Sequence, residues 1–120
     1  MSFPPRTESR NALLVTVSGH SIKLQGVLHE QDARDWLCPF LLEIHRIAVE
    51  TAMPEVIFDI RQLAYANAAL WRSLVFWLRL LKQSPDTPYR VRFLSDPVYR
   101  WQKLGVPPLA RLGGSWLVIR

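Results

Sequence analysis

The spacing of hydrophobic and polar positions predicts a β-hairpin followed by a helix in the first half of the chain. Residues 13–17 and 22–27 are rich in β-favouring side chains, and residues 18–21 between them have the composition of a turn. The second strand alternates apolar and polar residues, so one of its faces should be buried and the other solvated. From 32 to about 50, apolar residues recur at helical spacing, which predicts a helix with a start or kink near Pro39.

A short apolar strand and a second helix follow in the middle of the chain. Residues 56–60 are almost wholly apolar apart from Asp59, a pattern typical of a central strand that is covered on both faces. Residues 61–66 are expected to form a loop. Asn67 is a good N-cap for a helix that continues to Lys82.

The rest of the chain adds three shorter elements. They are a strand at 89–94, a short helix at 97–104 and a terminal strand at 116–119, with Pro85 and Pro88 ending the central helix and Gly113-Gly114 supplying the last turn. The order β-β-α-β-α-β-α-β predicts an α/β fold with one mixed sheet of about five strands and crossover helices. The polar residues 1–10 are expected to be a flexible leader to a single domain at 11–120.

Composition is consistent with one domain and a reducing compartment. The chain has 120 residues, of which 49% are apolar, which is enough to fill one core. The single Cys38 cannot form an internal disulfide, and it lies in an apolar stretch, as expected for a cytoplasmic protein. The N-terminus does not have the pattern of a secretory signal. The apolar-rich residues 64–81 are interrupted by polar side chains, so we expect a buried helix rather than a membrane span.

The net charge of +5 is unevenly distributed along the chain. Residues 1–60 carry five Lys/Arg against eight Asp/Glu, a net charge of −3, whereas residues 61–120 carry ten against two, a net charge of +8. A basic surface of this kind would attract an acidic partner or a nucleic-acid backbone at long range. The alternative is an ordinary solvated face, which the scatter of single basic residues favours.

The residues that usually carry catalysis do not converge in the sequence. Three histidines and Cys38 lack the spacing of metal ligands, and neither a phosphate-binding glycine loop nor a Gly-x-Ser-x-Gly motif occurs. Asp59 is the one charge within an apolar strand. It either orients the following loop, for example through Arg61, or takes part in catalysis, and we favour the first. The sequence predicts no catalytic residue, metal or cofactor.

Five tryptophans are many for a chain of this length. Trp36, Trp77 and Trp116 fall on the apolar positions of predicted elements, so core packing is expected for all three. Trp71 and Trp101 do not fall so clearly on a buried face. Each is either a core residue or an aromatic anchor at an interface.

The central strand and helix carry the sequence VIFDIRQLAYANAALWRSLVFWL at 56–78. It resembles the STAS domain, the fold of bacterial anti-sigma-factor antagonists. In that family an Asp near the end of a central strand precedes a hydrophobic loop, and an Asp/Asn, Ser, Ser/Thr motif then opens a helix. Asp59 matches the strand Asp, Leu63 and Tyr65 match the loop, and Asn67 matches the first residue of the motif. Residues 95–104 resemble the short helix that follows the family's fourth strand.

The resemblance implies a phosphate-controlled binding surface, and the sequence departs from it at the switch. In the family a partner kinase phosphorylates a hydroxyl of the motif, but Ala68 and Ala69 occupy both hydroxyl positions here. We therefore expect no phosphorylation at this site. Ser73 is a poor substitute because mid-helix hydroxyls usually bond back to a carbonyl. Arg72 is unfavourable in the first turn of a helix, so we expect it to face an acidic partner.

The leading hypothesis is a non-catalytic regulatory module of the bacterial cytoplasm. Its partner would be an anti-sigma-factor-like kinase or another signalling protein, with no membrane contact, and a homodimer is possible. The partner-binding residues would be those of the loop and helix start: Tyr65, Ala66, Asn67, Ala68, Ala69, Trp71 and Arg72. The alternative is a nucleic-acid-associated protein that uses the basic second half, although no nucleic-acid motif occurs. A small enzyme using Asp59 and His45 is the third reading.

Overall fold

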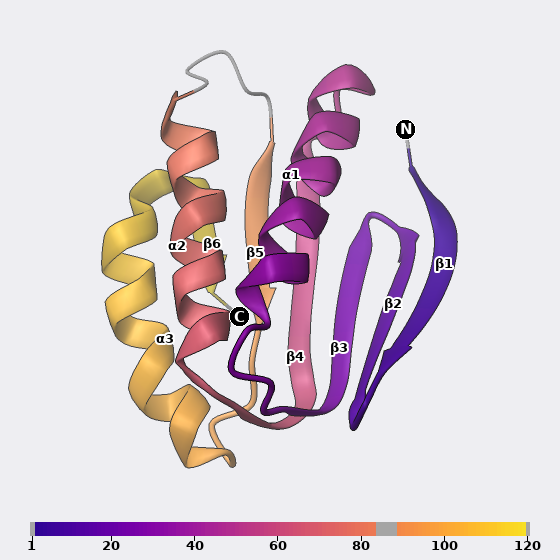
Figure 1. The fold of residues 1–120 in the computed structure, drawn as a ribbon. Helices are drawn as coiled ribbons and strands as arrows, with labels where there is room; N and C mark the ends of the chain where they lie inside the picture. Colours follow the sequence, from indigo (N-terminus) through magenta and orange to yellow (C-terminus); the bar gives the residue numbers. More distant parts are fainter. Residues whose placement is uncertain (1, 84–88, 120) are drawn as a thin grey trace.

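Across the residues that the structure describes, six strands form one mixed sheet, and three helices cover one of its faces (Figure 1). The computed structural model describes residues 2–83 and 89–119; residues 84–88, with Pro85 and Pro88, lie outside them. The elements in chain order are β1 (Phe3–Arg10), β2 (Leu13–Gly19), β3 (Ser21–Leu28), α1 (Arg34–Glu50), β4 (Glu55–Ala66), α2 (Ala68–Gln83), β5 (Arg90–Leu94), α3 (Arg100–Gly113), a 3₁₀ turn (Gly114–Trp116) and β6 (Leu117–Ile119). The predicted α/β class, the mixed sheet and the single domain are confirmed.

The strand order explains why the helices share a face. The sheet runs β1-β2-β3-β4-β5-β6, antiparallel over the first three strands and parallel from β3 onward. Each parallel strand is added on the same side of the previous one, and right-handed crossovers then place all three helices on one face. The carboxyl ends of β3, β4 and β5 meet at one edge, which we call the carboxyl edge and which lies at the bottom of Figure 1.

The core lies between the sheet and the helices. Phe58 of β4 stacks on Phe93 of β5 at a centroid distance of 5.5 Å and meets the edge of Trp77 of α2 at 5.7 Å. Trp77 is fully buried, while Trp36 and Trp116 are partly buried against the core, in line with the expected packing. The expectation that the strand at 56–60 is covered on both faces is wrong, because no helix of the described chain covers the second face of the sheet.

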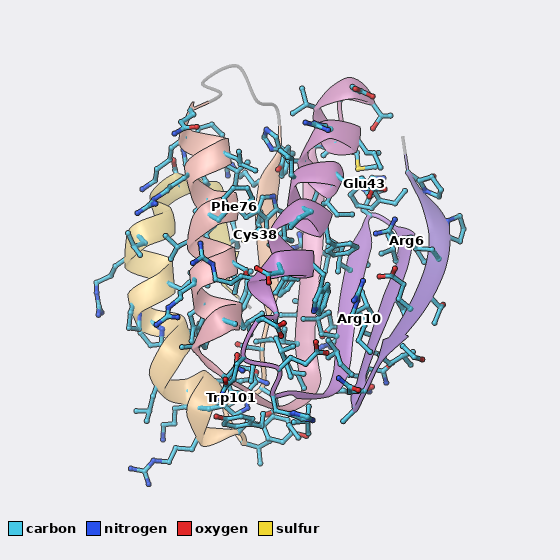
Figure 2. The ribbon with its side chains drawn as sticks, in the orientation of Figure 1. Arg6, Arg10, Cys38, Glu43, Phe76 and Trp101 are labelled. Atoms are coloured by element: carbon cyan, nitrogen blue, oxygen red, sulfur yellow. The ribbon has the colours of Figure 1, made fainter. Side chains whose placement is uncertain are left out.

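The expected flexible leader at 1–10 is wrong for Phe3–Arg10, which form β1 and raise the strand count from about five to six. The physical reason is side-chain packing that the polar composition conceals. Phe3 is fully buried. The Arg6 guanidinium lies over the Phe40 ring and pairs with Glu43 of α1 at 3.0 Å, and the Arg10 guanidinium lies over the Trp36 ring (Figure 2). These contacts fix the polar strand against α1.

Helices α1 and α3 both contain prolines. Helix α1 begins at Arg34 and continues through Pro39, so the alternative of a helix start near Pro39 is wrong. Helix α3 runs through Pro107 and Pro108 to Gly113, well past the expected end at 104. A proline in a helix interior removes one backbone hydrogen bond and costs about 3 kcal/mol or more, so these helices need other contacts to persist. In α3, Val106 and Leu109 on either side of the two prolines are buried in the core.

A buried chain of hydrogen bonds links α1, α2 and the start of β5. The Trp77 indole N–H donates to the Tyr89 hydroxyl at 2.9 Å, and the hydroxyl lies 2.7 Å from His45 Nδ1. An indole N–H can only donate, so the Tyr89 hydroxyl accepts from Trp77, and its own proton is free to be donated to Nδ1 of a neutral His45 imidazole. Burial lowers the pKa of His45 below its ordinary value and raises the pKa of Tyr89.

This burial predicts a loss of stability in mild acid. The unfolded chain takes up the His45 proton near pH 6.5 and the folded protein only at lower pH, so the free energy of unfolding should fall as the pH drops from about 7 to 5. Urea unfolding of His45→Gln should show a weaker fall than wild type over this range. The matched control is His29→Gln at an exposed position, which should behave as wild type. The same pH dependence in His45→Gln and wild type would contradict the prediction.

Candidate functional site

Asn67 joins three elements at the carboxyl edge. Its Oδ1 accepts from the Ala69 amide at 3.0 Å, its Nδ2 donates to the Glu30 carbonyl at 2.8 Å, and its own amide donates to the Leu28 carbonyl at 3.0 Å. The predicted N-cap is therefore confirmed. Because the side-chain amide is bonded on both sides, Asn67 positions the start of α2 rather than offering free polar groups to a partner.

The predicted loop at 61–66 is wrong, because β4 continues to Ala66. β4 stays paired with β3 over this segment because two β-bulges in β4 absorb its extra residues. Between the pairs Lys23–Asp59 and Gln25–Gln62, β4 has one more residue than β3, and Ala64 is a second extra residue just before Tyr65. Such bulges bend a strand and re-aim its side chains.

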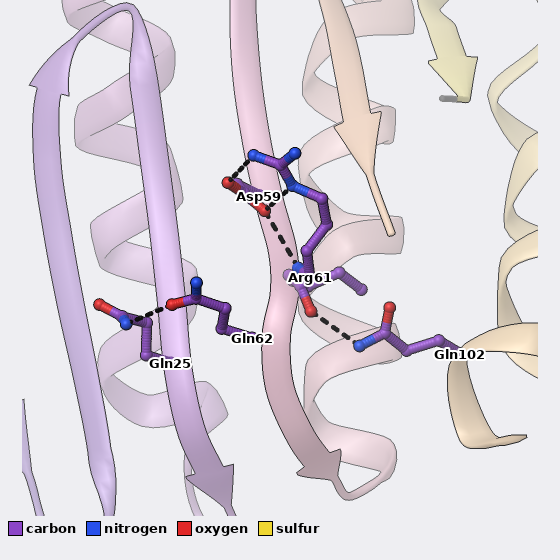
Figure 3. A network of polar contacts seen from close by, with 6 residues as sticks. Gln25, Asp59, Arg61, Gln62 and Gln102 are labelled. Atoms are coloured by element: carbon purple, nitrogen blue, oxygen red, sulfur yellow. Dashed lines mark hydrogen bonds and ion pairs between the residues drawn. The ribbon is translucent and has the colours of Figure 1, made fainter. Parts of the chain in front are cut away.

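The start of α3 holds the irregular end of β4. The buried Gln102 amide donates from Nε2 to the Ile60 carbonyl at 2.7 Å (Figure 3). The same Nε2 donates to the Leu63 carbonyl at 2.9 Å, and Oε1 accepts from the Asp96 amide at 2.8 Å. The neighbouring Trp101 indole donates to the Ala64 carbonyl at 2.8 Å. Three backbone carbonyls of β4 are therefore hydrogen-bonded by two adjacent side chains of one helix.

Sequence reasoning missed the role of Gln102, although a signal was present. Gln102 is spaced four residues before Val106 and seven before Leu109, so all three fall on one face of a helix. A polar side chain on an otherwise buried face must find partners. The helix expected at 97–104 does not include Val106 and Leu109, so the buried face that they share with Gln102 could not be recognised.

Asp59 and Arg61 form a bidentate pair on the uncovered face of the sheet. Asp59 Oδ1 accepts from the Arg61 amide and Nε at 3.0 Å each, and Oδ2 accepts from a terminal guanidinium nitrogen at 2.9 Å (Figure 3). Burial would raise the pKa of Asp59, but the hydrogen bonds and charge of Arg61, with a contribution from Lys23, lower it below its usual value. The expected pairing of Asp59 with Arg61 is confirmed, and it bridges the first bulge of β4.

The seven predicted binding residues divide by exposure. Ala66 and Ala69 point into the core, and Asn67 is half-buried and bonded as described. The exposed part of the set consists of Tyr65, Ala68 and Arg72, with Trp71 half-buried. Of the two positions that would carry hydroxyls in the resembling family, only Ala68 faces solvent.

Ser73 cannot replace the missing hydroxyls in this structure. Its side chain is fully buried, and its hydroxyl donates to the Ala69 carbonyl at 2.7 Å, one turn earlier in α2. The Cys38 sulfur lies 3.7 Å from the same hydroxyl, in the seam between α1 and α2 (Figure 2). This is the backward bond to a carbonyl that the sequence predicted.

Trp71 and Trp101 contact each other between α2 and α3. Their ring centroids are 5.7 Å apart. The Trp71 indole also lies directly on the α3 backbone, since a Cβ at Gly105 would approach Trp71 Cζ2 to 2.2 Å. Beyond this contact an apolar groove of about 270 Å³ runs between the helices, and we call it the α2/α3 groove: it is lined by Trp71, Val75, Gly105, Pro108, Leu109 and Leu112.

Basic and large apolar side chains are exposed on α2, on α3 and at the carboxyl edge. Neither α2 nor α3 contains a carboxylate, whereas six exposed basic residues lie on them: Arg72, Arg79, Lys82, Arg100, Lys103 and Arg111. Large apolar side chains are also exposed at the carboxyl edge and along α3: Tyr65 (49% exposed), Val98 (75%), Leu104 (63%) and Leu112 (50%). The excess positive charge of the second half of the chain thus coincides with exposed apolar surface.

Within residues 2–83 and 89–119, no three His, Cys, Asp or Glu side chains come together in a way that could hold a metal ion. Among the helices of the same residues, none has the length and apolar character needed to cross a membrane.

In comparisons with known proteins, no family model and no curated sequence matches the chain. Its function must therefore be inferred from its residues and their geometry.

The contact between Trp71 and Gly105 predicts strong coupling between the two positions. Gly105→Ala should destabilise the protein by about 1–3 kcal/mol, because the new methyl group displaces the indole. In a Trp71→Ala background the same change should be neutral or stabilising by up to about 1 kcal/mol, since alanine favours a helix. Urea unfolding of the four proteins gives the coupling energy. Equal effects of Gly105→Ala in both backgrounds would contradict the contact.

Proposed function

We propose that this protein is a non-catalytic regulatory module that binds a protein partner through the surface formed by Tyr65, Ala68, Trp71 and Arg72. The observation that carries the proposal is the gathering of exposed apolar side chains at the carboxyl edge and along α3. Exposed apolar patches surrounded by polar residues are typical of interaction sites. Aromatic and arginine side chains of the kind found here contribute most to such interfaces.

The rigid support of this surface favours binding over a merely solvated loop. Asn67 fixes the start of α2, and Gln102 and Trp101 fix the end of β4 that leads into it. A surface that is already ordered loses little conformational entropy when a partner binds. Exposed residues on such a support can therefore contribute to affinity without the cost of ordering a loop.

The charge of the surface favours an acidic partner. Arg72 is the fifth residue of α2 and so lies past the first turn in which it was expected, and neither α2 nor α3 contains a carboxylate that could neutralise it. An acidic group on a partner would supply the opposite charge and would accelerate association.

The resemblance to STAS regulators supports the same class of function. It suggests an anti-sigma-factor-like kinase or another signalling protein of the bacterial cytoplasm as partner. With alanines at both hydroxyl positions, the proposed binding is constitutive rather than controlled by a phosphate at the start of α2.

The absence of a phosphate switch is tested by mass spectrometry. After incubation with ATP and candidate partner kinases, no stoichiometric phosphate is expected within residues 66–73, because Ser73 is buried and the alanines have no hydroxyl. Ala68→Ser provides the positive control, since it restores a hydroxyl at an exposed position. Stoichiometric phosphate on the wild-type segment would overturn this part of the proposal.

Partner binding is tested by affinity capture from the source cell with a charge-reversed bait. Arg72→Glu should lower recovery of the specific partner by at least about tenfold, because it places an acidic group against an acidic surface. The matched control is Arg46→Glu, the same change at an exposed position of α1, which should retain the partner. Circular dichroism and thermal unfolding establish that both baits are folded. If wild type and Arg72→Glu recover the same proteins in equal amounts, the proposed surface is wrong.

The second candidate function is nucleic-acid association, favoured by the six exposed basic residues on α2 and α3. Sequence-independent binding to DNA or RNA that collapses as salt is added would support it. Against it, the Trp71 ring is covered by Gly105 and Trp101 and is thus poorly placed to stack on a base.

A further inference from the structure

We propose that the α2/α3 groove binds an acidic amphipathic helix of a partner protein. The inference rests on the proposed function, because it names the partner chemistry for a surface that begins at Trp71 and Arg72. It also extends that surface along α3 to Leu112, away from the carboxyl edge. The lining, the length and the charged rim of the groove each favour such an occupant.

The lining favours apolar side chains as occupants. The groove is lined by aromatic and aliphatic groups together with the bare backbone of Gly105, and none of its lining side chains is charged. Small-molecule pockets usually enclose roughly 300–1,000 Å³ and contain several placed polar groups. The α2/α3 groove is smaller, at about 270 Å³, and lacks such groups, so it suits a few side chains of a larger partner.

The length of the groove suits two turns of a helix. Its α3 wall runs from Gly105 to Leu112, a distance of about 10 Å at the helical rise of 1.5 Å per residue. Leu104 extends this exposed stripe, since it lies four residues before Pro108 and eight before Leu112. Apolar residues at positions i, i+3 or i+4, and i+7 of a partner helix span the same distance.

Basic residues flank the groove on both helices. On α2, Arg72 and Arg79 lie three residues before and four residues after Val75, so they share a stripe with it. On α3, Arg111 lies three residues after Pro108. All three arginines are exposed, and neither helix has a carboxylate to neutralise them. The complementary surface is an apolar stripe with acidic residues on both sides.

The groove is held open by contacts at both of its ends. At one end the Trp71 ring separates α2 from α3 at Gly105. At the other end Lys82 Nζ of α2 donates to the Leu112 carbonyl at the end of α3. These contacts fix the spacing of the helices, so a partner does not need to separate them before it binds.

The test uses the full chain and designed helical peptides of 16 residues. The probe peptide has Leu at i, i+3, i+7 and i+10 and Glu at most other positions. One control peptide replaces each Glu by Lys, and a second replaces each Leu by Ser. Two-dimensional NMR titration should give the probe a dissociation constant below about 1 mM, with shifts at Val75, Leu109 and Leu112, and at least about tenfold weaker binding of both controls.

Protein variants locate the site without disturbing the core. Arg79→Glu and Arg111→Glu change exposed residues and should each weaken probe binding by about fivefold or more. Leu112 is also exposed, and Leu112→Ser removes part of the apolar groove wall, so it should weaken probe binding to a similar degree. Arg46→Glu on α1 should leave the affinity unchanged. Thermal unfolding of each variant shows whether the fold is retained.

Four results would contradict helix binding in the groove. They are no binding up to about 2 mM probe, equal binding of the Glu and Lys peptides, chemical-shift changes outside the groove, or an affinity that Arg79→Glu and Arg111→Glu leave unchanged. Two other occupants are also distinguished. The same shifts on raising the protein concentration alone would indicate a second copy, and the same shifts on adding a 12-base-pair duplex would indicate nucleic acid; either overturns the proposal.

The outcome is separable from that of the proposed function. If a partner is captured that depends on Arg72 but the peptide does not bind, the proposed role of the groove is wrong and the proposed regulatory function stands. If the peptide binds but no captured partner depends on Arg72, the proposed role of the groove stands and the proposed binding surface around Tyr65 and Arg72 is wrong.

Discussion

The irregular end of β4 is the constraint on which the rest of the structure depends. Two extra residues interrupt its pairing with β3, and a buried backbone group left unpaired costs about 1–3 kcal/mol. Gln102 and Trp101 supply donors to the carbonyls of Ile60, Leu63 and Ala64. Meeting this requirement fixes the start of α3 against the carboxyl edge, and with it the position from which α3 runs back beside α2.

The same constraint connects the core to the exposed surface. Because the end of β4 is held, Asn67 can cap α2 and direct Ala68 and Arg72 to solvent while Ala69 packs inside. Because α3 is placed beside α2, Trp71 fits onto Gly105 and the groove forms behind it. The proposed binding surface therefore depends on buried side chains as well as exposed ones, and none of these supporting contacts needs a hydroxyl at position 68 or 69.

Local patterns predicted the class of fold and the central elements, and non-local contacts account for what they missed. The apolar strand, the Asn67 cap and the pairing of Asp59 with Arg61 are short-range features, and the structure confirms each of them. The polar residues of β1 are ordered by stacking on α1, more than twenty residues away in sequence. Similarly, α3 continues past Pro107 and Pro108, where Val106 and Leu109 pack into the core. The α2/α3 groove is formed by two helices that are far apart in the sequence, so no local pattern could predict it.

The central claim is that one continuous surface, from the end of β4 along α3, is where a partner binds. Hydrogen–deuterium exchange of the protein with its captured partner tests this most directly, because it reports on every segment at once. The account predicts slower exchange within residues 65–72 and 100–113 of the complex, and no change in β1, β2 or β3. Slower exchange confined to those three strands, with 65–72 and 100–113 unaltered, would contradict it.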